Sequence, residues 1–290
     1  MEPCADSEST RRMNSPGEDQ FKGLGNLNLY YQCWLPPNKP KAILLVVHGL
    51  AEHSGRYSNL VNYFVPRGYA VYGFDQRGHG KSDGLKGYVE RFSYFVNDLN
   101  TFLGIVRGRH HDAKIFIIGH SIGGTIATVH AIHHQNEFDG LILSGATLKV
   151  GAGVPAGLII AARVLSLLLP KVGLYVIDAT AISRDKGVVC AYVSDPFVYR
   201  GKIRARLGIE LIKAMETLQR QMSKICLPIL VMHGTADRLS DSEGSKILYE
   251  RANSRDKTLK LYKGFYHEIF NEPECQQVFA DVEAWLVPRV

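Results

Sequence analysis

Cysteine is scarce in this chain, because only five of its 290 residues are cysteines and these are scattered. None stands in a Cys-X-X-Cys pair, so neither a disulfide framework nor a zinc knuckle is expected. A secretory signal is also lacking, because residues 1–19 are polar and contain acids, proline and glycine. We expect residues 1–19 to be a disordered tail. These absences favour a reducing, cytoplasmic location for a protein that is not secreted.

Long apolar runs are missing as well. The strongest candidate, Val154–Leu169, is shorter than the ~20 residues that cross a bilayer and carries Arg163 in its middle. An amphipathic helix fits this segment better, with an apolar stripe formed by Leu158, Ile159, Ala162, Leu165 and Leu169. Such a helix is either a lid that lines a lipid entrance or touches a membrane, or a helix simply buried against the domain.

Two ligand classes lack their motifs. No Gly-X-Gly-X-X-Gly follows a predicted strand and no phosphate loop is present, so no nucleotide is expected. His130, His133 and His134 share one helix face, but no His-Glu-X-X-His accompanies them. Imidazoles are favoured at the C-terminal end of a helix by its dipole, which explains them without a metal. We therefore expect neither a metal ion nor a cofactor.

The net charge of +6 raises the question of an anionic partner. Most basic residues are interspersed with acids. The exception is a basic cluster that consists of Arg200, Lys202, Arg204, Arg206, Lys213, Arg220 and Lys224. No nucleic-acid-binding motif accompanies the cluster, so nucleic acid is not expected as a partner. A membrane-facing surface and a solvated face both remain open for it.

Predicted strands and helices alternate along most of the chain. Residues 20–34 are typical of a β-hairpin, and apolar runs predict strands at 42–47, 69–74, 114–121 (with its following turn), 140–144, 227–232 and 258–262. Helices are predicted at about 57–66, 92–108, from the turn to about 135, 242–252 and 274–286. The alternation predicts an α/β fold with a mostly parallel central sheet flanked by helices. The interruption at 145–222 predicts a helical cap inserted into one domain that spans 20–290.

The pentapeptide Gly119-His120-Ser121-Ile122-Gly123 lies where a buried strand meets a helix. This arrangement is typical of a nucleophile elbow, in which a strained turn exposes the serine hydroxyl. A serine needs a base to remove its proton and a carboxylate to orient that base. Asp237 and His267 both follow predicted strands, and the order Ser121, Asp237, His267 is that of an α/β-hydrolase.

Other acids and histidines fit the triad less well. Asp75 precedes Ser121 in the chain, Asp241 comes too late, and Asp195 lies in the inserted region. His53 and His79 belong to glycine-bearing loops, where they stabilise turns more plausibly. An oxyanion hole needs backbone N–H groups after the nucleophile and after an earlier strand, and Leu50 and Ile122 occupy those places.

Four segments together resemble the monoacylglycerol lipase family: His48-Gly49-Leu50-Ala51-Glu52-His53-Ser54-Gly55-Arg56-Tyr57, Asp75-Gln76-Arg77-Gly78-His79-Gly80-Lys81-Ser82, Gly119–Gly124 and Ala236-Asp237-Arg238-Leu239. The resemblance runs from about residue 20 to the C-terminus. It implies a cofactor-free serine hydrolase that cleaves monoacylglycerols, a single-chain lipid ester, to fatty acid and glycerol. It also implies a hydrophobic tunnel under the cap and peripheral contact with membranes.

By position, the resemblance implies a glycerol-binding pocket formed by Glu52, Arg56, His120 and Tyr192. Two departures from the mammalian enzymes stand out: Leu50-Ala51 replaces Ala-Gly, and Ser240 replaces a cysteine. The first should slightly alter the oxyanion loop, and the second removes a thiol near the site. A lysophospholipase, a general carboxylesterase and a non-catalytic receptor of the same fold remain alternatives.

Overall fold

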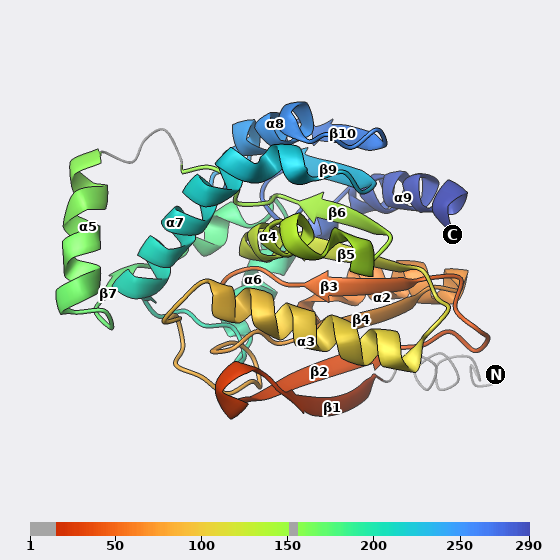
Figure 1. Ribbon diagram of the computed structural model, residues 1–290, viewed down its shortest axis with the longest axis horizontal. Helices are drawn as coiled ribbons and strands as arrows, with labels where there is room; N and C mark the ends of the chain where they lie inside the picture. The colour runs from red at the N-terminus through yellow and green to blue at the C-terminus, as the bar shows by residue number, and fades with distance from the viewer. Residues whose placement is uncertain (1–15, 151–155) are drawn as a thin grey trace, which may run out of the picture.

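The computed structural model describes residues 16–150 and 156–290 (Figure 1). Strands in these residues form one central sheet in the order β1-β2-β4-β3-β5-β6-β9-β10. Their bounds are β1 Gly17–Lys22, β2 Asn28–Trp34, β3 Ile43–Val47, β4 Ala70–Phe74, β5 Ile115–His120, β6 Gly140–Ser144, β9 Ile229–Gly234 and β10 Lys257–Tyr262. The strands from β4 to β10 run parallel, and only β1 and β2 are antiparallel to their neighbours. The predicted α/β-hydrolase fold is therefore confirmed.

The central strands are buried along their whole length, as their continuous apolar sequences predict. Parallel pairing brings their carboxyl ends to one edge of the sheet. Val47 pairs with Gly119, and His120 pairs with Ser144 at that edge. Loops that leave these strands therefore start side by side, although they are distant in the sequence.

Helices cover both faces of the sheet. Helices α3 (Ser93–Arg109), α4 (Ile122–His134) and α8 (Ser242–Arg251) pack on one face, and α2 (Ser58–Phe64) and α9 (Cys275–Leu286) pack on the other. The ring centroid of Phe102 in α3 lies 5.2 Å from that of Phe21, 5.3 Å from that of Tyr31 and 4.9 Å from that of Phe74. Truncating such a buried ring costs roughly 3–5 kcal/mol, so this cluster fastens the hairpin to the domain.

The chain between β6 and β9 leaves the sheet and forms the inserted segment, residues 145–222. It contains α5 (Ala156–Leu168), β7 (Gly173–Tyr175), α6 (Lys186–Ser194), β8 (Ile203–Arg204) and α7 (Ala205–Gln221). Helix α5 stands at the edge of the molecule beside α7 (Figure 1), and Arg163 reaches Glu216 of α7 at 2.8 Å. Neither α6 nor α7 was predicted, although apolar residues recur at helical spacing along α7: Leu207, Leu211, Met215 and Leu218.

The prediction of a disordered tail over residues 1–19 is wrong for residues 17–19. Strand β1 starts at Gly17, and Asp19 pairs with Tyr31 across the hairpin. Main-chain pairing does not require apolar side chains, so a polar segment joins the sheet as its exposed edge. The Asp19 carboxylate also accepts a hydrogen bond from the Tyr31 hydroxyl at 3.1 Å. Residues 1–15, with Cys4, and residues 151–155, with the predicted start of α5, lie outside the described residues.

Candidate active site

Ser121 stands between the end of β5 and the start of α4, with φ 53° and ψ −122°. Such a conformation is strained for a residue with a side chain. The flanking glycines permit the close packing around it. A Cβ on Gly123 would lie 2.0 Å from the Val47 carbonyl oxygen, and one on Gly119 would lie 2.7 Å from the Gly124 Cα. The predicted elbow geometry is therefore present.

Asp237 and His267 are brought together from the loops after β9 and β10. The distance from His267 Nδ1 to Asp237 Oδ2 is 2.7 Å, and the other carboxylate oxygen accepts from the amides of Leu239 and Ser240 at 2.8 and 3.0 Å. Burial lowers the pKa of His267, but the Asp237 carboxylate outweighs it and the pKa lies above its usual value. Burial raises the pKa of Asp237, yet its two histidine neighbours, His267 and His233, outweigh burial and hold that pKa well below its usual range.

A second histidine on this carboxylate was missed by sequence reasoning. His233 Nε2 lies 3.0 Å from Asp237 Oδ2, and its Nδ1 lies 2.7 Å from the Ser245 hydroxyl. The imidazole is fully buried. Its place at the end of β9, four residues before Asp237, is the signal that could have revealed it. The Asp237 carboxylate is therefore fixed by two amides and two imidazoles.

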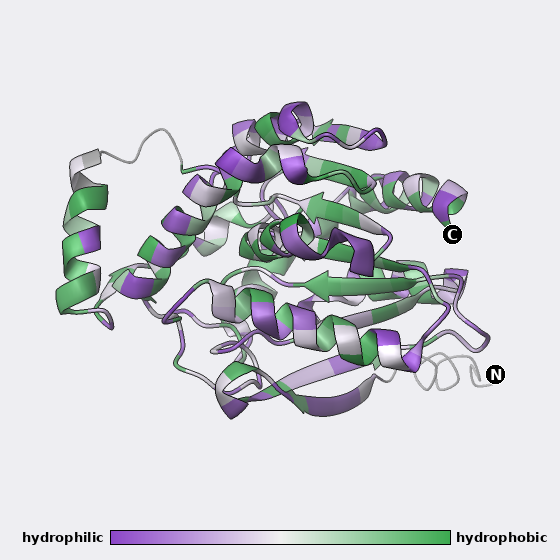
Figure 2. Cartoon of the chain, in the orientation of Figure 1, coloured by the Kyte–Doolittle hydropathy of each residue, from purple (hydrophilic) through white to green (hydrophobic). Residues whose placement is uncertain are grey.

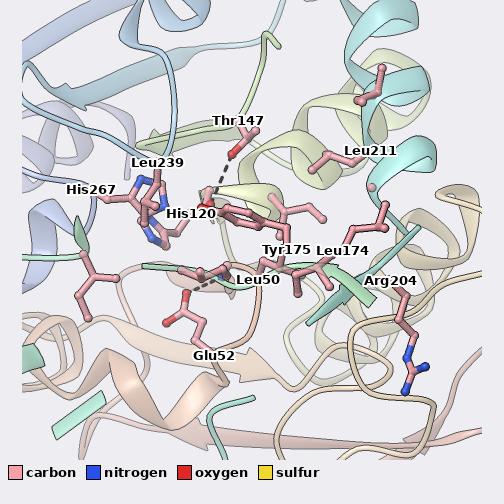
Figure 3. A pocket seen from close by; sticks show the side chains of 18 of the residues that line it. Leu50, Glu52, His120, Thr147, Leu174, Tyr175, Arg204, Leu211, Leu239 and His267 are labelled. Atoms are coloured by element: carbon pink, nitrogen blue, oxygen red, sulfur yellow. Dashed lines mark hydrogen bonds between the residues drawn. The ribbon is translucent and has the colours of Figure 1, made fainter. Parts of the chain in front are cut away.

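Ser121 and His267 line one cavity, but no hydrogen bond joins them in the described part of the chain. Instead, Ser121 Oγ lies 3.4 Å from Thr147 Oγ1, which lies 2.7 Å from the Ser240 hydroxyl. Figure 3 shows His267 and Thr147 among the side chains around this cavity. Nucleophile and base are often loosely placed in a free enzyme and tighten with substrate. Thr147 was also missed, because its position after β6 has no local sequence pattern.

The amides predicted for the oxyanion hole are unpaired. Neither the Leu50 nor the Ile122 N–H donates to another residue within 16–150 or 156–290. The neighbouring Gly49 N–H, in contrast, donates to the Glu52 carboxylate. Ala51 has a left-handed φ of 66° at the turn of this loop. Leu50 and Ile122 both line the cavity that contains Ser121, so two free N–H groups beside the elbow are suited to an incoming anion.

The polar end of the cavity holds a buried cluster of charges. The Arg56 guanidinium contacts Glu52 Oε2 at 3.0 Å and both carboxylate oxygens of Glu268 at 2.6 and 2.9 Å. It also lies over the Tyr192 ring, 4.7 Å from its centroid. Burial lowers the pKa of Arg56, but the two carboxylates outweigh it and raise the pKa above its usual value.

Of the predicted glycerol-pocket residues, Glu52, His120 and Tyr192 line the cavity, whereas Arg56 is not among its lining residues. Arg56 instead positions the two carboxylates. Glu268 does line the cavity, and sequence reasoning missed it although it directly follows His267. The predicted residues are therefore gathered at one place, with Arg56 behind the surface and Glu268 added to it.

His120 lies directly beside the base. Its ring centroid is 4.7 Å from that of His267, and its Nδ1 is 2.9 Å from the Ser144 carbonyl oxygen (Figure 3). Burial and the neighbouring His267 lower the pKa of His120 to about 4. This imidazole is therefore neutral near pH 7 and offers a polar edge without adding charge.

The remainder of the cavity is apolar and comes mainly from the inserted segment. The whole cavity, polar end included, has a volume of about 530 Å³. Lining residues from this segment include Ile159, Ala162, Leu174, Ile177, Ile203 and Ile212. Pockets of this size hold small organic ligands, and apolar walls suit an aliphatic chain. The cavity therefore joins an apolar compartment to a polar end, with Ser121 between them.

The rejected triad candidates have structural partners. Asp75 accepts from the amide and hydroxyl of Ser54 at 2.8 and 2.7 Å. His53 Nε2 lies 2.9 Å from Asp195 and thereby links the loop after β3 to the inserted segment. His79 is buried beside His48, with ring centroids 5.3 Å apart.

An eight-stranded α/β fold with a serine elbow at the strand ends defines an α/β-hydrolase. A family profile described as serine aminopeptidase, S33 (Hydrolase_4) matches residues 38–274. A monoacylglycerol lipase of Mycolicibacterium smegmatis is 38% identical over 273 residues, covering 94% of this chain and 98% of that protein. A monoglyceride lipase of Homo sapiens is 37% identical over 264 residues, covering 90% and 87%.

A solved structure is also similar to this one. It is a soluble variant of monoglyceride lipase from Saccharomyces cerevisiae in complex with a substrate analogue, with a TM-score of 0.86 and 26% identity over 96% of both chains. The chain belongs to the monoacylglycerol lipase family of serine hydrolases. It is accordingly a serine ester hydrolase.

Proposed function

We propose that this chain hydrolyses monoacylglycerols to a fatty acid and glycerol through an acyl-enzyme on Ser121. The observation that carries the proposal is a cavity whose apolar compartment and polar end meet at the elbow serine. The acyl chain occupies the apolar compartment, and the glycerol occupies the polar end beside Glu52, His120, Tyr192 and Glu268. The similarity to the monoacylglycerol lipase of M. smegmatis supports the same substrate.

In the first half of the reaction, His267 Nε2 takes the proton of Ser121 as its Oγ attacks the ester carbonyl carbon. Asp237 holds Nδ1 and stabilises the imidazolium. The Leu50 and Ile122 amides donate to the oxyanion. When the intermediate collapses, the bond to the glycerol oxygen breaks and His267 returns the proton to that oxygen. Ser121 must turn away from Thr147 for this step.

In the second half, a water molecule takes the place of glycerol. His267 removes a proton from the water, and the resulting hydroxide attacks the acyl carbon. The bond to Ser121 Oγ then breaks, the serine regains its proton from His267, and the fatty acid leaves. No other group is consumed, so the cycle restores the starting enzyme.

The charge of the polar end favours a neutral head group over a phosphate. Two carboxylates, Glu52 and Glu268, face one guanidinium, so the cluster carries one net negative charge. A phosphate placed beside this buried cluster would be repelled, and repulsion in a buried site is weakly screened. This observation favours monoacylglycerol over the lysophospholipid alternative.

We also propose that the inserted segment is a cap that contacts membranes. The outward side of α5 is apolar at the edge of the molecule (Figure 2), and Leu167 and Leu168 are 71% and 74% exposed. Val172, Tyr175 and Val176 continue this surface along the chain. No helix in the described residues is long and apolar enough to cross a bilayer. An exposed apolar face beside the cavity therefore supports contact with the lipid surface rather than a span.

The basic cluster predicted at 200–224 contributes less to such a contact. Arg206 lies 3.9 Å from Glu90, and Lys213 lies 2.8 Å from Glu210. Arg204 donates to the carbonyl oxygens of Lys86 and Lys171 at 3.1 and 2.6 Å. With several of its members engaged in this way, the cluster is not a single free patch.

The test compares initial rates on monoacylglycerol, lysophosphatidylcholine, lysophosphatidic acid, a short p-nitrophenyl ester and an aminoacyl p-nitroanilide. We expect the highest kcat/KM on monoacylglycerol and, among the three lipids, the lowest on lysophosphatidic acid. Ser121→Ala should abolish every ester activity and labelling by a fluorophosphonate. A preference for the short ester or the anilide would overturn the substrate assignment, and full activity of Ser121→Ala would overturn the nucleophile.

A further inference from the structure

Three metal-ligating side chains meet at the end of α4 that is remote from Ser121. His130 and His134 are one turn apart on α4, and Glu137 is in the 3-10 turn Gln135–Glu137 that follows it. One ligand atom from each of the three residues lies within 4.8 Å of the other two. His133, which the sequence places on the same face, is exposed and does not belong to this group.

His130 forms the floor of the cluster. Its side chain is fully buried, and its Nε2 lies 3.0 Å from Asn100 Oδ1 of α3. In the tautomer whose Nε2–H donates to this oxygen, Nδ1 carries the lone pair. That Nδ1 has no hydrogen-bond partner among the described residues. A buried polar atom without a partner is rare, and a histidine whose other nitrogen donates to an oxygen is typical of metal ligands.

His134 and Glu137 complete the cluster toward solvent. His134 Nδ1 lies 2.8 Å from Glu137 Oε1, and the His130 and His134 rings are stacked with centroids 4.7 Å apart. The His134 and Glu137 side chains are 35% and 50% exposed, so an ion can reach the buried His130. The neighbouring Arg107 donates to the Glu137 carbonyl oxygen at 3.1 Å, so the Glu137 carboxylate has His134 alone as its side-chain partner among the described residues, and both would turn to the ion.

We propose that His130, His134 and Glu137 form a binding site for a divalent transition metal of the Zn²⁺ type, with water as the fourth ligand. Two imidazole nitrogens and one carboxylate oxygen match the ligands that Zn²⁺ prefers. Tetrahedral bonds of about 2.05 Å place the ligand atoms about 3.3 Å apart, and rotation of the two exposed side chains supplies this contraction. The dipole of α4 favours a cation at this end.

The bound ion fastens the end of α4 to the turn that leads into β6. Because α4 begins directly after Ser121, the site stabilises the helix that follows the nucleophile without contacting substrate. The expectation of no metal ion was based on His130, His133 and His134, and it did not include Glu137. The third ligand comes from the following turn, so the histidine spacing alone does not show the site.

The test titrates the full chain, stripped of metal by a chelator, with Zn²⁺ in a calorimeter and with Co²⁺ in a spectrophotometer. We expect one Zn²⁺ per chain and the visible absorption of tetrahedral Co²⁺. His134→Gln and Glu137→Gln should each weaken binding at least about tenfold. His133→Gln, on the same helix but outside the cluster, should bind as the parent does. The His130 side chain is left unchanged because its burial makes a substitution prone to unfold the chain.

Labelling Ser121 with a fluorophosphonate before the titration separates this site from the histidines at the cavity. We expect the labelled chain to bind one Zn²⁺ with unchanged affinity. The proposal is overturned if no ion binds, if binding is lost on labelling, or if His134→Gln and Glu137→Gln bind as tightly as the parent chain.

Discussion

The strand-end loops and the inserted segment form opposite walls of one cavity, but they hold their side chains differently. On the strand-end wall, the carboxylates of Glu52, Asp237 and Glu268 are nearly inaccessible, and each has at least three hydrogen bonds. On the other wall, Leu174 and Tyr175 remain 46% and 55% exposed. The carboxylates, which must point in one direction, stand on loops at the sheet edge. The inserted segment supplies apolar side chains, whose contact with a ligand needs no fixed orientation.

Replacing Asp237 by Asn should produce the largest loss on the strand-end wall. The amide keeps the shape but cannot hold the His267 proton on Nδ1 as the carboxylate does, so we expect kcat to fall by about 10⁴-fold. Steady-state kinetics on monoacylglycerol measure this loss. Circular dichroism should show an unchanged fold, and a loss of less than tenfold would mean that Asp237 does not orient the base.

The same carboxylate sets the pH dependence. His267 must be neutral to act as a base, and Asp237 raises its pKa above the usual imidazole value. Activity of the parent chain should therefore fall as pH drops through that raised pKa. The residual activity of Asp237→Asn should persist to lower pH, because the removed charge no longer favours the imidazolium. A pH profile of kcat/KM for both proteins measures the shift, and identical midpoints would contradict it.

Arg56 tests the charge cluster behind the strand-end wall. Arg56→Leu leaves two buried carboxylates unpaired, so the free energy of unfolding near pH 7 should fall by roughly 3–5 kcal/mol. Burial raises the pKa of Glu268, whereas Arg56 outweighs it and holds the pKa below its usual value. Without Arg56 that pKa should rise above its unfolded value, so the variant regains stability as pH falls.

Urea titrations at pH 7 and pH 5 measure this effect. From pH 7 to pH 5 the variant should gain stability relative to the parent chain, because the lowered Glu268 pKa of the parent contributes its full stabilisation at every pH above the unfolded pKa of about 4.5. The double variant Arg56→Leu, Glu268→Gln is the matched control, since it removes one of the stranded charges. If the double variant is no more stable than Arg56→Leu, the cluster does not act as described.

Local sequence patterns predicted the strand-end wall better than the wall formed by the inserted segment. The strands, Ser121, Asp237 and His267 were predictable because apolar runs and strand ends are contiguous in the sequence. The pairing of Arg56 with Glu268 joins residues 212 positions apart, and no local pattern contains it. Helix α7 was missed because its basic residues were interpreted as a charge cluster, although its apolar spacing is helical. The start of β1 was missed because main-chain pairing leaves no mark on polar side chains.

The inserted segment should respond to changes in membrane contact rather than in chemistry. Replacing Leu167 and Leu168 by Ser removes two exposed apolar side chains from α5, and we expect vesicle binding to weaken about tenfold, or about 1.4 kcal/mol. The kcat on a dispersed short ester should not change. Co-sedimentation with phosphatidylcholine vesicles measures binding. The control variant Leu261→Ser, Val287→Ser removes exposed apolar side chains outside the inserted segment, and equal losses in both variants would contradict a specific face.

The smallest effect concerns backbone strain in the oxyanion loop. Ala51 has φ 66°, a conformation that costs a residue with a side chain roughly 1–2 kcal/mol. Ala51→Gly relieves this strain, but the greater freedom of glycine in the unfolded chain offsets about 0.5–1 kcal/mol. We therefore expect the free energy of unfolding to rise by between zero and about 1.5 kcal/mol, with kcat within threefold of the parent (~0.65 kcal/mol).

Gly145 is the matched comparison for Ala51, because its φ of 54° is similar but the space around it is not. A Cβ there would lie 2.9 Å from the His267 carbonyl oxygen and 3.3 Å from its Nδ1. Gly145→Ala therefore adds both strain and a contact that displaces the base, so it should lower both stability and kcat. If the two substitutions, measured by urea unfolding and turnover, had effects of equal size, left-handed backbone alone would explain both. A loss of kcat confined to Gly145→Ala would show that the new contact with His267, rather than left-handed backbone, causes the loss.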